Sequence, residues 1–233
     1  MVVIGSNGPY EKSRIAAGAT VTDKPELDAA YGLQSVEDNR RLYAAWAQTY
    51  DCDFADHMGY VLPARVADIF ATAAGVVKTG CVLDVGAGTG LVGQRLAFHG
   101  FTRVDGVDIS SEMLAVAASK GCYNSMIEGD LLGCLPIAAD TYDFIISAGT
   151  FTHGHVGAEA LDELLRIARP GAIFCLSINS AHFTTAGFAV AFERLAGRIE
   201  GLEFCPVQFY LESATGPHAN DHGVIALFSK CMI

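Results

Sequence analysis

The stretch CVLDVGAGTG, Cys81–Gly90, decides the fold of this chain. Its apolar first half predicts a buried β-strand that ends near Asp84, and three alternating glycines then predict a sharp turn into a helix. Eighteen residues after Gly90, a second apolar segment ends in Asp108. A strand, a glycine turn, a helix and a second strand closed by an acid are typical of a nucleoside-binding half-site.

Composition limits what the chain can be. Its 233 residues are 51% hydrophobic, which suits one globular domain, with or without a small appendage. The formal net charge is −11, and the 15 basic residues are scattered along the chain. A surface of this kind disfavours phosphate backbones and anionic membranes. We therefore expect no nucleic acid and no membrane as a partner, and the sequence does not indicate an oligomeric state.

The seven cysteines form no CxxC pair and no regular spacing. Several lie within apolar segments, where cysteine usually acts as a small buried hydrophobe. The N-terminus carries no pattern of a secretory signal, and no segment reaches 18 uninterrupted apolar residues. These observations predict a reduced, cytoplasmic protein.

Strands and helices alternate along most of the chain. We expect strands near 81–85, 103–108, 124–128, 142–147, 171–178, 203–211 and 223–230. We expect helices near 37–48, from 63 onward, and near 90–99, 111–120, 157–168 and 185–199. The pattern predicts an α/β fold of the Rossmann-like type: a seven-stranded, mostly parallel sheet with helices on both faces. The last two strands are joined without a helix, so the final strand should run antiparallel. Residues 1–78 should form an arm, expected to be partly mobile, and a helical cap, and residues 79–233 the nucleoside-binding domain.

Two cofactors compete for the glycine turn. GTGLVG, Gly88–Gly93, matches the dinucleotide pattern GxGxxG, but that match alone is weak. Asp84 would place a negative charge beside a pyrophosphate, about 80 residues precede the first strong strand, and Asp108 lies only 15 residues past Gly93. S-adenosylmethionine carries no phosphate and bears positive charges. Asp108 can accept hydrogen bonds from both hydroxyls of its ribose, so this cofactor fits better.

The chain resembles the class I S-adenosylmethionine-dependent methyltransferases over roughly residues 42–180. LDVGAGTG matches their first motif, VDIS the acid of their second strand, and EGDLLG the segment that flanks adenine. The departures are Ala87, where many members carry cysteine, and RPGA in place of KPGG. Other segments resemble the methyltransferase-like branch that includes the Williams–Beuren-region protein. The fold and this resemblance together imply a cofactor site formed by Tyr50, Asp84, Gly86, Ala87, Gly88, Gly90, Asp108, Ile109, Met113, Asp130, Leu131 and Ser147. Trp46 and Tyr60 are further candidates for the pocket wall, although aromatic residues at helical spacing usually belong to a core.

Two histidines follow the fourth predicted strand, in the segment AGTFTHGHVG. His153 and His155 should lie near the methyl group and could act as a general base on an acceptor hydroxyl, thiol or amine. A lone HxH pair does not make a metal site, so no metal is expected. The leading hypothesis is a methyltransferase for an O, S or N nucleophile of a small molecule. The alternatives are a nicotinamide-dependent oxidoreductase and a noncatalytic S-adenosylmethionine-binding protein.

Overall fold

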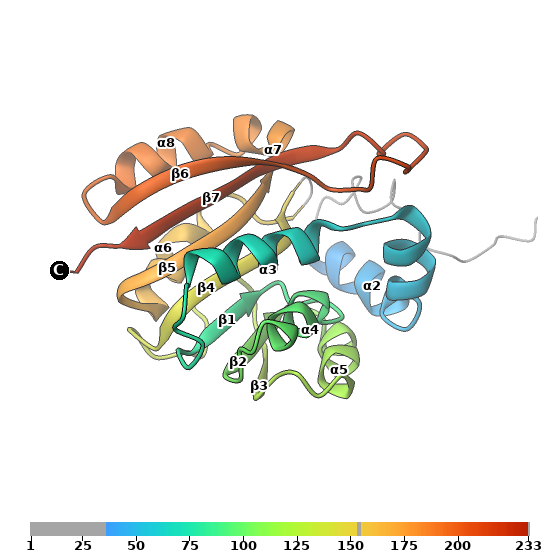
Figure 1. The fold of residues 1–233 in the computed structure, drawn as a ribbon, viewed down its shortest axis with the longest axis horizontal. Coiled ribbons are helices and arrows are strands. Elements are labelled where there is room, and N and C mark those ends of the chain that lie inside the picture. Colours follow the sequence, from blue (N-terminus) through green and yellow to red (C-terminus); the bar gives the residue numbers. More distant parts are fainter. Residues whose placement is uncertain (1–35, 153–154, 233) are drawn as a thin grey trace, which may run out of the picture.

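The computed structural model describes residues 36–152 and 155–232 and contains a seven-stranded sheet of order β3-β2-β1-β4-β5-β7-β6 (Figure 1). The strands are β1 (Val82–Val85), β2 (Val104–Asp108), β3 (Ser125–Glu128), β4 (Tyr142–Phe151), β5 (Ala168–Asn179), β6 (Ile199–Gln208) and β7 (His222–Lys230). The first five strands pair in parallel, whereas β7 is antiparallel to both β5 and β6. The predicted fold, a mostly parallel sheet whose last strand is reversed, is confirmed.

Helices cover both faces of the sheet. They are α2 (Val36–Trp46), the π-helix η1 (Tyr50–Asp56), α3 (Leu62–Ala73), α4 (Leu91–Phe98), α5 (Ser111–Ser119), α6 (Ala160–Ile167), α7 (Ser180–Thr185) and α8 (Phe188–Leu195). Figure 1 shows α3, α4 and α5 on one side of the sheet, with α6, α7 and α8 on the other. Within the described ranges, no helix is long and apolar enough to cross a membrane.

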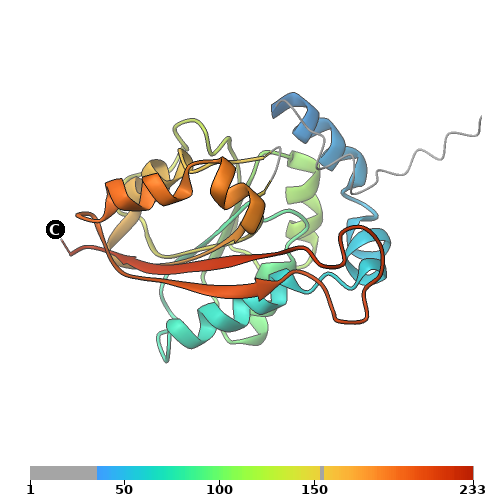
Figure 2. The same cartoon turned by 90° about the horizontal axis from the view of Figure 1, so that it is seen from above.

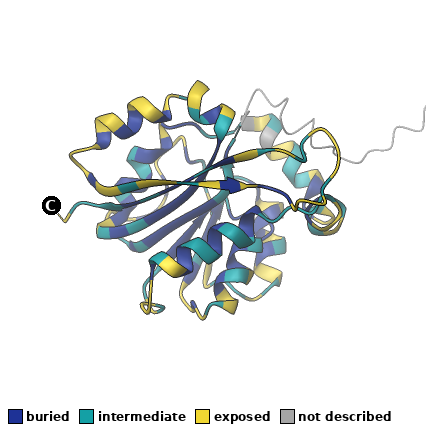
Figure 3. Ribbon diagram, turned by 45° about the horizontal axis from the view of Figure 1, so that its top comes forward, coloured by how far each residue is buried: buried dark blue, intermediate teal, exposed yellow. Residues whose placement is uncertain are grey.

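Side chains of the central strands alternate between two cores, one on each face of the sheet. On β4, Phe144 and Ile146 pack in the core that α3 and α4 close, while Ile145 packs in the core that α6 and α8 close. The central strands are therefore buried on both faces, as their dark colour in Figure 3 shows. This explains why their sequences are continuous apolar runs without the alternation of a half-exposed strand.

The hairpin of β6 and β7 reaches from one end of the sheet to the N-terminal helices. Seen from above in Figure 2, its loop lies beside the segment that contains η1. Backbone hydrogen bonds fix this contact: the amides of Val61 and Leu62 both donate to the carbonyl of Phe209, and Tyr60 forms an isolated bridge with Tyr210. The loop after β6 is thereby attached to the N-terminal cap, a name we use for α2, η1 and the segment that leads to α3.

The bounds of two predicted elements were wrong, and two short helices, α7 and η1, were missed. One helix was expected over 185–199, but the chain forms α7 and α8, because the Asn179 side chain caps α7 and Gly187, at φ 71°, separates the two. Strand β6 was expected over 203–211. Its pairing with β7 instead begins at Ile199, and the chain leaves the sheet after Gln208 to meet the cap. The π-helix η1 was not predicted. The expected arm, residues 1–35, lies outside the described residues.

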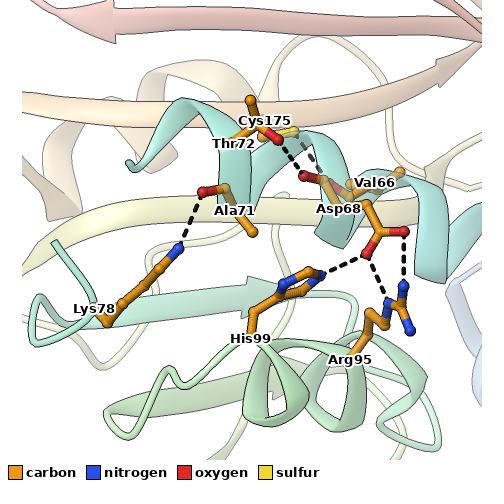
Figure 4. A network of polar contacts seen from close by, with 8 residues as sticks. All are labelled: Val66, Asp68, Ala71, Thr72, Lys78, Arg95, His99 and Cys175. Atoms are coloured by element: carbon orange, nitrogen blue, oxygen red, sulfur yellow. Dashed lines mark hydrogen bonds and ion pairs between the residues drawn. The ribbon is translucent and has the colours of Figure 1, made fainter. Parts of the chain in front are cut away.

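An ionic cluster fixes α3 against α4 (Figure 4). Asp68 on α3 accepts hydrogen bonds from the Arg95 guanidinium at 2.7 and 3.0 Å and lies 2.6 Å from Nε2 of His99. The bonds from Arg95 lower the pKa of Asp68 below its usual range. Because α3 connects directly to the cap and α4 directly to the glycine turn, this cluster stabilises the relative position of the two parts.

Candidate functional site

A deep pocket opens at the carboxyl ends of β1, β2 and β4, where open α/β sheets bind their ligands. Its wall combines the glycine turn, the end of β2, the loop after β3, the end of β4, the cap and the loop after β6. Of the residues predicted to contact a cofactor, those on the wall are Tyr50, Gly86, Ala87, Gly88, Asp108, Ile109, Met113, Asp130 and Leu131. The fold therefore brings together segments as far apart in the sequence as Tyr43 and Tyr210.

The glycine turn approaches the end of β4 closely at Gly86. This residue has φ 69°, a left-handed backbone conformation that is strained for any residue other than glycine. A Cβ atom there would also collide with Thr150, whose hydroxyl donates to the carbonyl of Val85 at 2.9 Å. The amides of Gly86 and Ala87 both donate to Val107 on β2. The turn is thus held from both neighbouring strands, and glycine is required for its geometry.

Asp108 lies at the end of β2 with both carboxylate oxygens held in place. Oδ2 accepts from the amide of Gly88 at 2.9 Å, and Oδ1 accepts from the amide of Ser110 at 2.9 Å. Burial raises the pKa of Asp108, and these backbone hydrogen bonds partly oppose that rise. An ionised carboxylate oxygen can accept more than one hydrogen bond. Each oxygen therefore keeps capacity for one ligand hydroxyl, which suits a pair of adjacent hydroxyls such as those of a ribose.

Apolar side chains surround the space next to Asp108. Ile109 and the almost fully buried Met113 form one wall, and Leu131 contributes from the loop after β3. Asp130, in the same loop, accepts the amide of Leu132 at 2.9 Å. Apolar side chains with a carboxylate nearby suit a purine base attached to the sugar.

Three predicted cofactor residues lie behind the pocket wall instead of on it. Asp84 has no exposed surface, and its Oδ2 accepts from the hydroxyl of Tyr123 at 2.6 Å. Gly90 caps α4 at φ 88° and packs against Tyr123, and the Ser147 hydroxyl donates to the carbonyl of Val85 at 2.8 Å. All three support the turn from beneath, and their direct contact with a cofactor stays a prediction.

Burial of Asp84 has an electrostatic consequence. Its Oδ1 is buried and has no hydrogen-bond partner within the described residues. Desolvation raises the pKa of Asp84 to about 7; the hydrogen bond from Tyr123 lowers it, and the nearby Asp108 adds a smaller rise. The sequence correctly placed an acid at the turn, but it did not indicate that Tyr123, 39 residues away, would be its partner.

Aromatic residues of the cap close the other side of the pocket. Tyr43, Tyr50 and Tyr60 lie on its wall, and the ring of Tyr50 is 6.4 Å from that of Tyr43. Trp46 is 3% exposed, packs edge-on against Tyr50 and does not line the pocket, so it belongs to the core of the cap. Tyr50 is thereby positioned from behind by Trp46.

A polar link connects the cap to the glycine turn. Asp51, next to Tyr50 on η1, accepts from the hydroxyl of Thr89 at 2.5 Å and pairs with the ammonium of Lys120 at 2.6 Å. Thr89 belongs to the turn, and Lys120 caps the C-terminus of α5. The Asp51 carboxylate therefore connects the segment that carries Tyr50 to the glycine turn and to the end of α5.

The structure describes one of the two candidate histidines, His155. His155 lies on the pocket wall, with its ring 5.5 Å from the ring of Tyr43. His153 lies outside the described residues. Asn179 and Ser177, at the end of β5, also line the pocket, and Ser177 accepts the amide of Gly149 at 3.0 Å. Within the described ranges, no group of three His, Cys, Asp or Glu side chains is placed to hold a metal ion.

Sequence reasoning missed part of the site. Tyr43, Phe209 and Tyr210 line the pocket but carry no motif. Tyr43 lies one helical turn before Trp46, so its spacing gave a weak signal; the other two follow a strand whose end was misplaced. Only the tertiary contact between the β6–β7 loop and the cap brings them to the pocket.

Comparison with known proteins agrees with this geometry. Residues 83–176 match the family described as methyltransferase domain. The chain is 33% identical over 191 residues to human methyltransferase-like protein 27, covering 79% of this chain and 77% of that protein. The chain belongs to the class I S-adenosylmethionine-dependent methyltransferases. Membership implies S-adenosylmethionine as its cofactor, and no observation favours a nicotinamide-dependent enzyme.

Solved structures share the fold at low sequence identity. A SAM-dependent methyltransferase from Aquifex aeolicus superposes with a TM-score of 0.55 at 20% identity, over 79% of this chain and 97% of that one. The cyclase SpnF gives a TM-score of 0.62 at 17% identity, over 86% and 97%. These likenesses establish the architecture alone. The reaction has to be argued from the residues of the pocket.

Proposed function

We propose that this methyltransferase acts on an oxygen, sulfur or nitrogen nucleophile of a small molecule. The observation that carries the proposal is the pocket itself, where an anchored Asp108 and an apolar base site meet an aromatic cap. The Tyr60–Tyr210 bridge joins the cap to the β6–β7 loop, and residues of both line the pocket together with the end of β4, which favours a small acceptor over a chain segment. The similarity to human methyltransferase-like protein 27 supports a place in the methyltransferase-like branch that includes the Williams–Beuren-region protein.

The residues present fit S-adenosylmethionine. In this proposal Asp108 holds the ribose, Ile109, Met113, Asp130 and Leu131 surround the adenine, and Tyr50 covers the methionine. Gly86, Ala87 and Gly88 allow the close approach of the backbone. Asp84, Gly90 and Ser147 act by positioning the turn, and above its raised pKa of about 7 Asp84 adds negative charge beneath the cationic end of the cofactor.

Positioning should dominate the chemistry. Bound S-adenosylmethionine supplies an electrophilic methyl group on a sulfur that leaves as a neutral thioether. Aligning two bound reactants can contribute about 7–11 kcal/mol, whereas a general base typically contributes about 10²–10⁴-fold. His155 is our candidate for accepting the proton that the acceptor loses, because it lies on the wall beside Tyr43. His153 remains a candidate from the sequence.

Two measurements test the proposal. S-adenosylhomocysteine should raise the melting temperature of the purified protein, whereas NADH should not. Radiolabelled S-adenosylmethionine should then transfer its methyl group to members of a small-molecule library. Stabilisation by S-adenosylhomocysteine without turnover on any acceptor would indicate the noncatalytic alternative, and stabilisation by NADH alone would indicate the oxidoreductase. The seven free cysteines suit a reducing compartment, so a cytoplasmic location belongs to the proposal.

A further inference from the structure

Four tyrosines and Phe209, all from the cap and the β6–β7 loop, line one part of the pocket. Tyr43, Tyr50, Tyr60 and Tyr210 come from the cap and the β6–β7 loop, and Phe209 joins them. The ring of Tyr60 lies 5.5 Å from that of Tyr210, and the ring of Tyr43 lies 6.4 Å from that of Tyr50. We call these five residues the aromatic wall.

The hydroxyls of the aromatic wall are available to a ligand. None of the four tyrosines forms a side-chain hydrogen bond with another residue in the described part of the chain. Burial raises the pKa of Tyr50 well above its usual value, and the neighbouring Tyr60, Tyr43 and Tyr210 add smaller rises. A Cβ atom at Gly149 would come within 2.7 Å of the Tyr60 hydroxyl, which places that hydroxyl over the end of β4.

Charge on the pocket wall is distributed unevenly. Asp108 and Asp130 carry the negative charge, and both lie at the nucleoside end. Among the described residues of the wall there is no lysine and no arginine, and His155 is the one histidine. An anionic group on the acceptor would therefore lose its hydration without gaining a lysine or arginine partner, which is unfavourable. Burial raises the pKa of Tyr43 and Tyr60, and the nearby Asp108 adds to the rise at Tyr43, in line with a site that disfavours negative charge.

From this arrangement we infer that the methyl acceptor is an uncharged aromatic molecule, held between the aromatic wall and the end of β4. Aromatic rings favour offset or edge contacts at centroid separations of about 4.5–7 Å, the range in which the rings of the wall pack against one another. The free hydroxyls would bind a neutral polar group on the ring, such as a carbonyl or a hydroxyl. The inference rests on the proposed function and narrows its acceptor to one chemical class.

Matched pairs of compounds test the inference. Each pair consists of a hydroxy- or amino-substituted benzoate and its methyl ester, which share the ring and the nucleophile and differ in charge. Binding to the protein saturated with S-adenosylhomocysteine is measured by ligand-observed NMR, and transfer is measured with labelled S-adenosylmethionine. We expect the esters to bind at least 10-fold more tightly than the benzoates and to be the members that accept methyl groups. Equal or tighter binding of the benzoates, or no binding by any ester, would overturn the inference.

Two variants of the aromatic wall test whether its hydroxyls bind the acceptor. Tyr60→Phe and Tyr210→Phe keep the rings and remove the hydroxyls, so the affinity for the bound esters should fall about fivefold or more in at least one variant. The affinity for S-adenosylhomocysteine should stay unchanged. Tyr142→Phe is the matched control, because its hydroxyl bonds to Asp105 outside the pocket. Ester affinities unaffected by both wall variants would contradict the role of the hydroxyls. If S-adenosylhomocysteine itself fails to bind, the proposed function fails first, and that result is distinct from a preference for benzoates.

Discussion

Replacing Asp84 by asparagine should change how the stability of the protein depends on pH. Asp84 is fully buried, and its pKa is raised to about 7 by desolvation. In the unfolded chain an aspartate has a pKa of about 3.9. Between these two values the folded protein binds a proton at Asp84 that the unfolded chain has lost, so stability contributed by this site falls as pH rises through the window.

The size of the effect follows from the two pKa values. Between pH 5 and pH 8 the Asp84 carboxyl should remove about 2–3 kcal/mol from the free energy of unfolding. Asparagine cannot ionise, so the variant should lack this decline, although its buried amide adds a cost of about 1–3 kcal/mol that does not vary with pH. Between pH 5 and pH 8, the free energy of unfolding of the variant should therefore rise by about 2–3 kcal/mol relative to that of the wild type.

Urea unfolding in matched buffers from pH 5 to pH 8 measures this difference. The comparison cancels the other titrating groups, because both proteins share them. Parallel pH profiles for wild type and Asp84→Asn would refute the reasoning. They would mean that Asp84 is ionised in the folded protein across the whole range, and that its burial carries no electrostatic cost.

Three further perturbations test other parts of the site. Gly86→Ala should weaken binding of S-adenosylhomocysteine at least 10-fold in calorimetry, whereas Gly201→Ala, which has a similar φ of 66° but no neighbour within 4 Å, should leave binding intact; equal losses would remove the steric argument. Asp51→Asn should lose its pairing with Lys120 and lower the free energy of unfolding by about 1 kcal/mol, with a smaller difference in 1 M salt. An undiminished difference at high salt would argue against a charge effect. His155→Ala should lower kcat by about 10²-fold or more while leaving measurable turnover and unchanged cofactor affinity; full activity would exclude it as the base.

Most of the scaffold could be predicted from the sequence. β1 and the glycine turn are specified locally, since an apolar run followed by glycines with positive φ has few alternatives. The reversed β7 followed from a connection without a helix. The π-helix η1 and the break at Gly187 were missed, because both depend on packing of short segments whose own pattern is ambiguous.

The candidate site was predictable only where a motif carries it. Asp108 and the loop at Asp130 follow strands and lie on the pocket wall, as expected from the sequence. Tyr210 could not be found, since its place depends on the backbone bridge to Tyr60, 150 residues earlier. The side chain of Asp84 also escaped prediction: the charge was correctly located, but its complete burial under the turn depends on Tyr123.

Calorimetric titration with S-adenosylhomocysteine tests the central claim most directly. Asp108→Asn keeps the size of the side chain but replaces one acceptor oxygen by a donor, so it should lose one backbone and one ribose hydrogen bond and weaken binding by about 100-fold or more. Asp105→Asn, on the same strand and outside the pocket, should bind like wild type. Unchanged affinity in Asp108→Asn, or binding of NADH in place of S-adenosylhomocysteine by the wild type, would contradict the account.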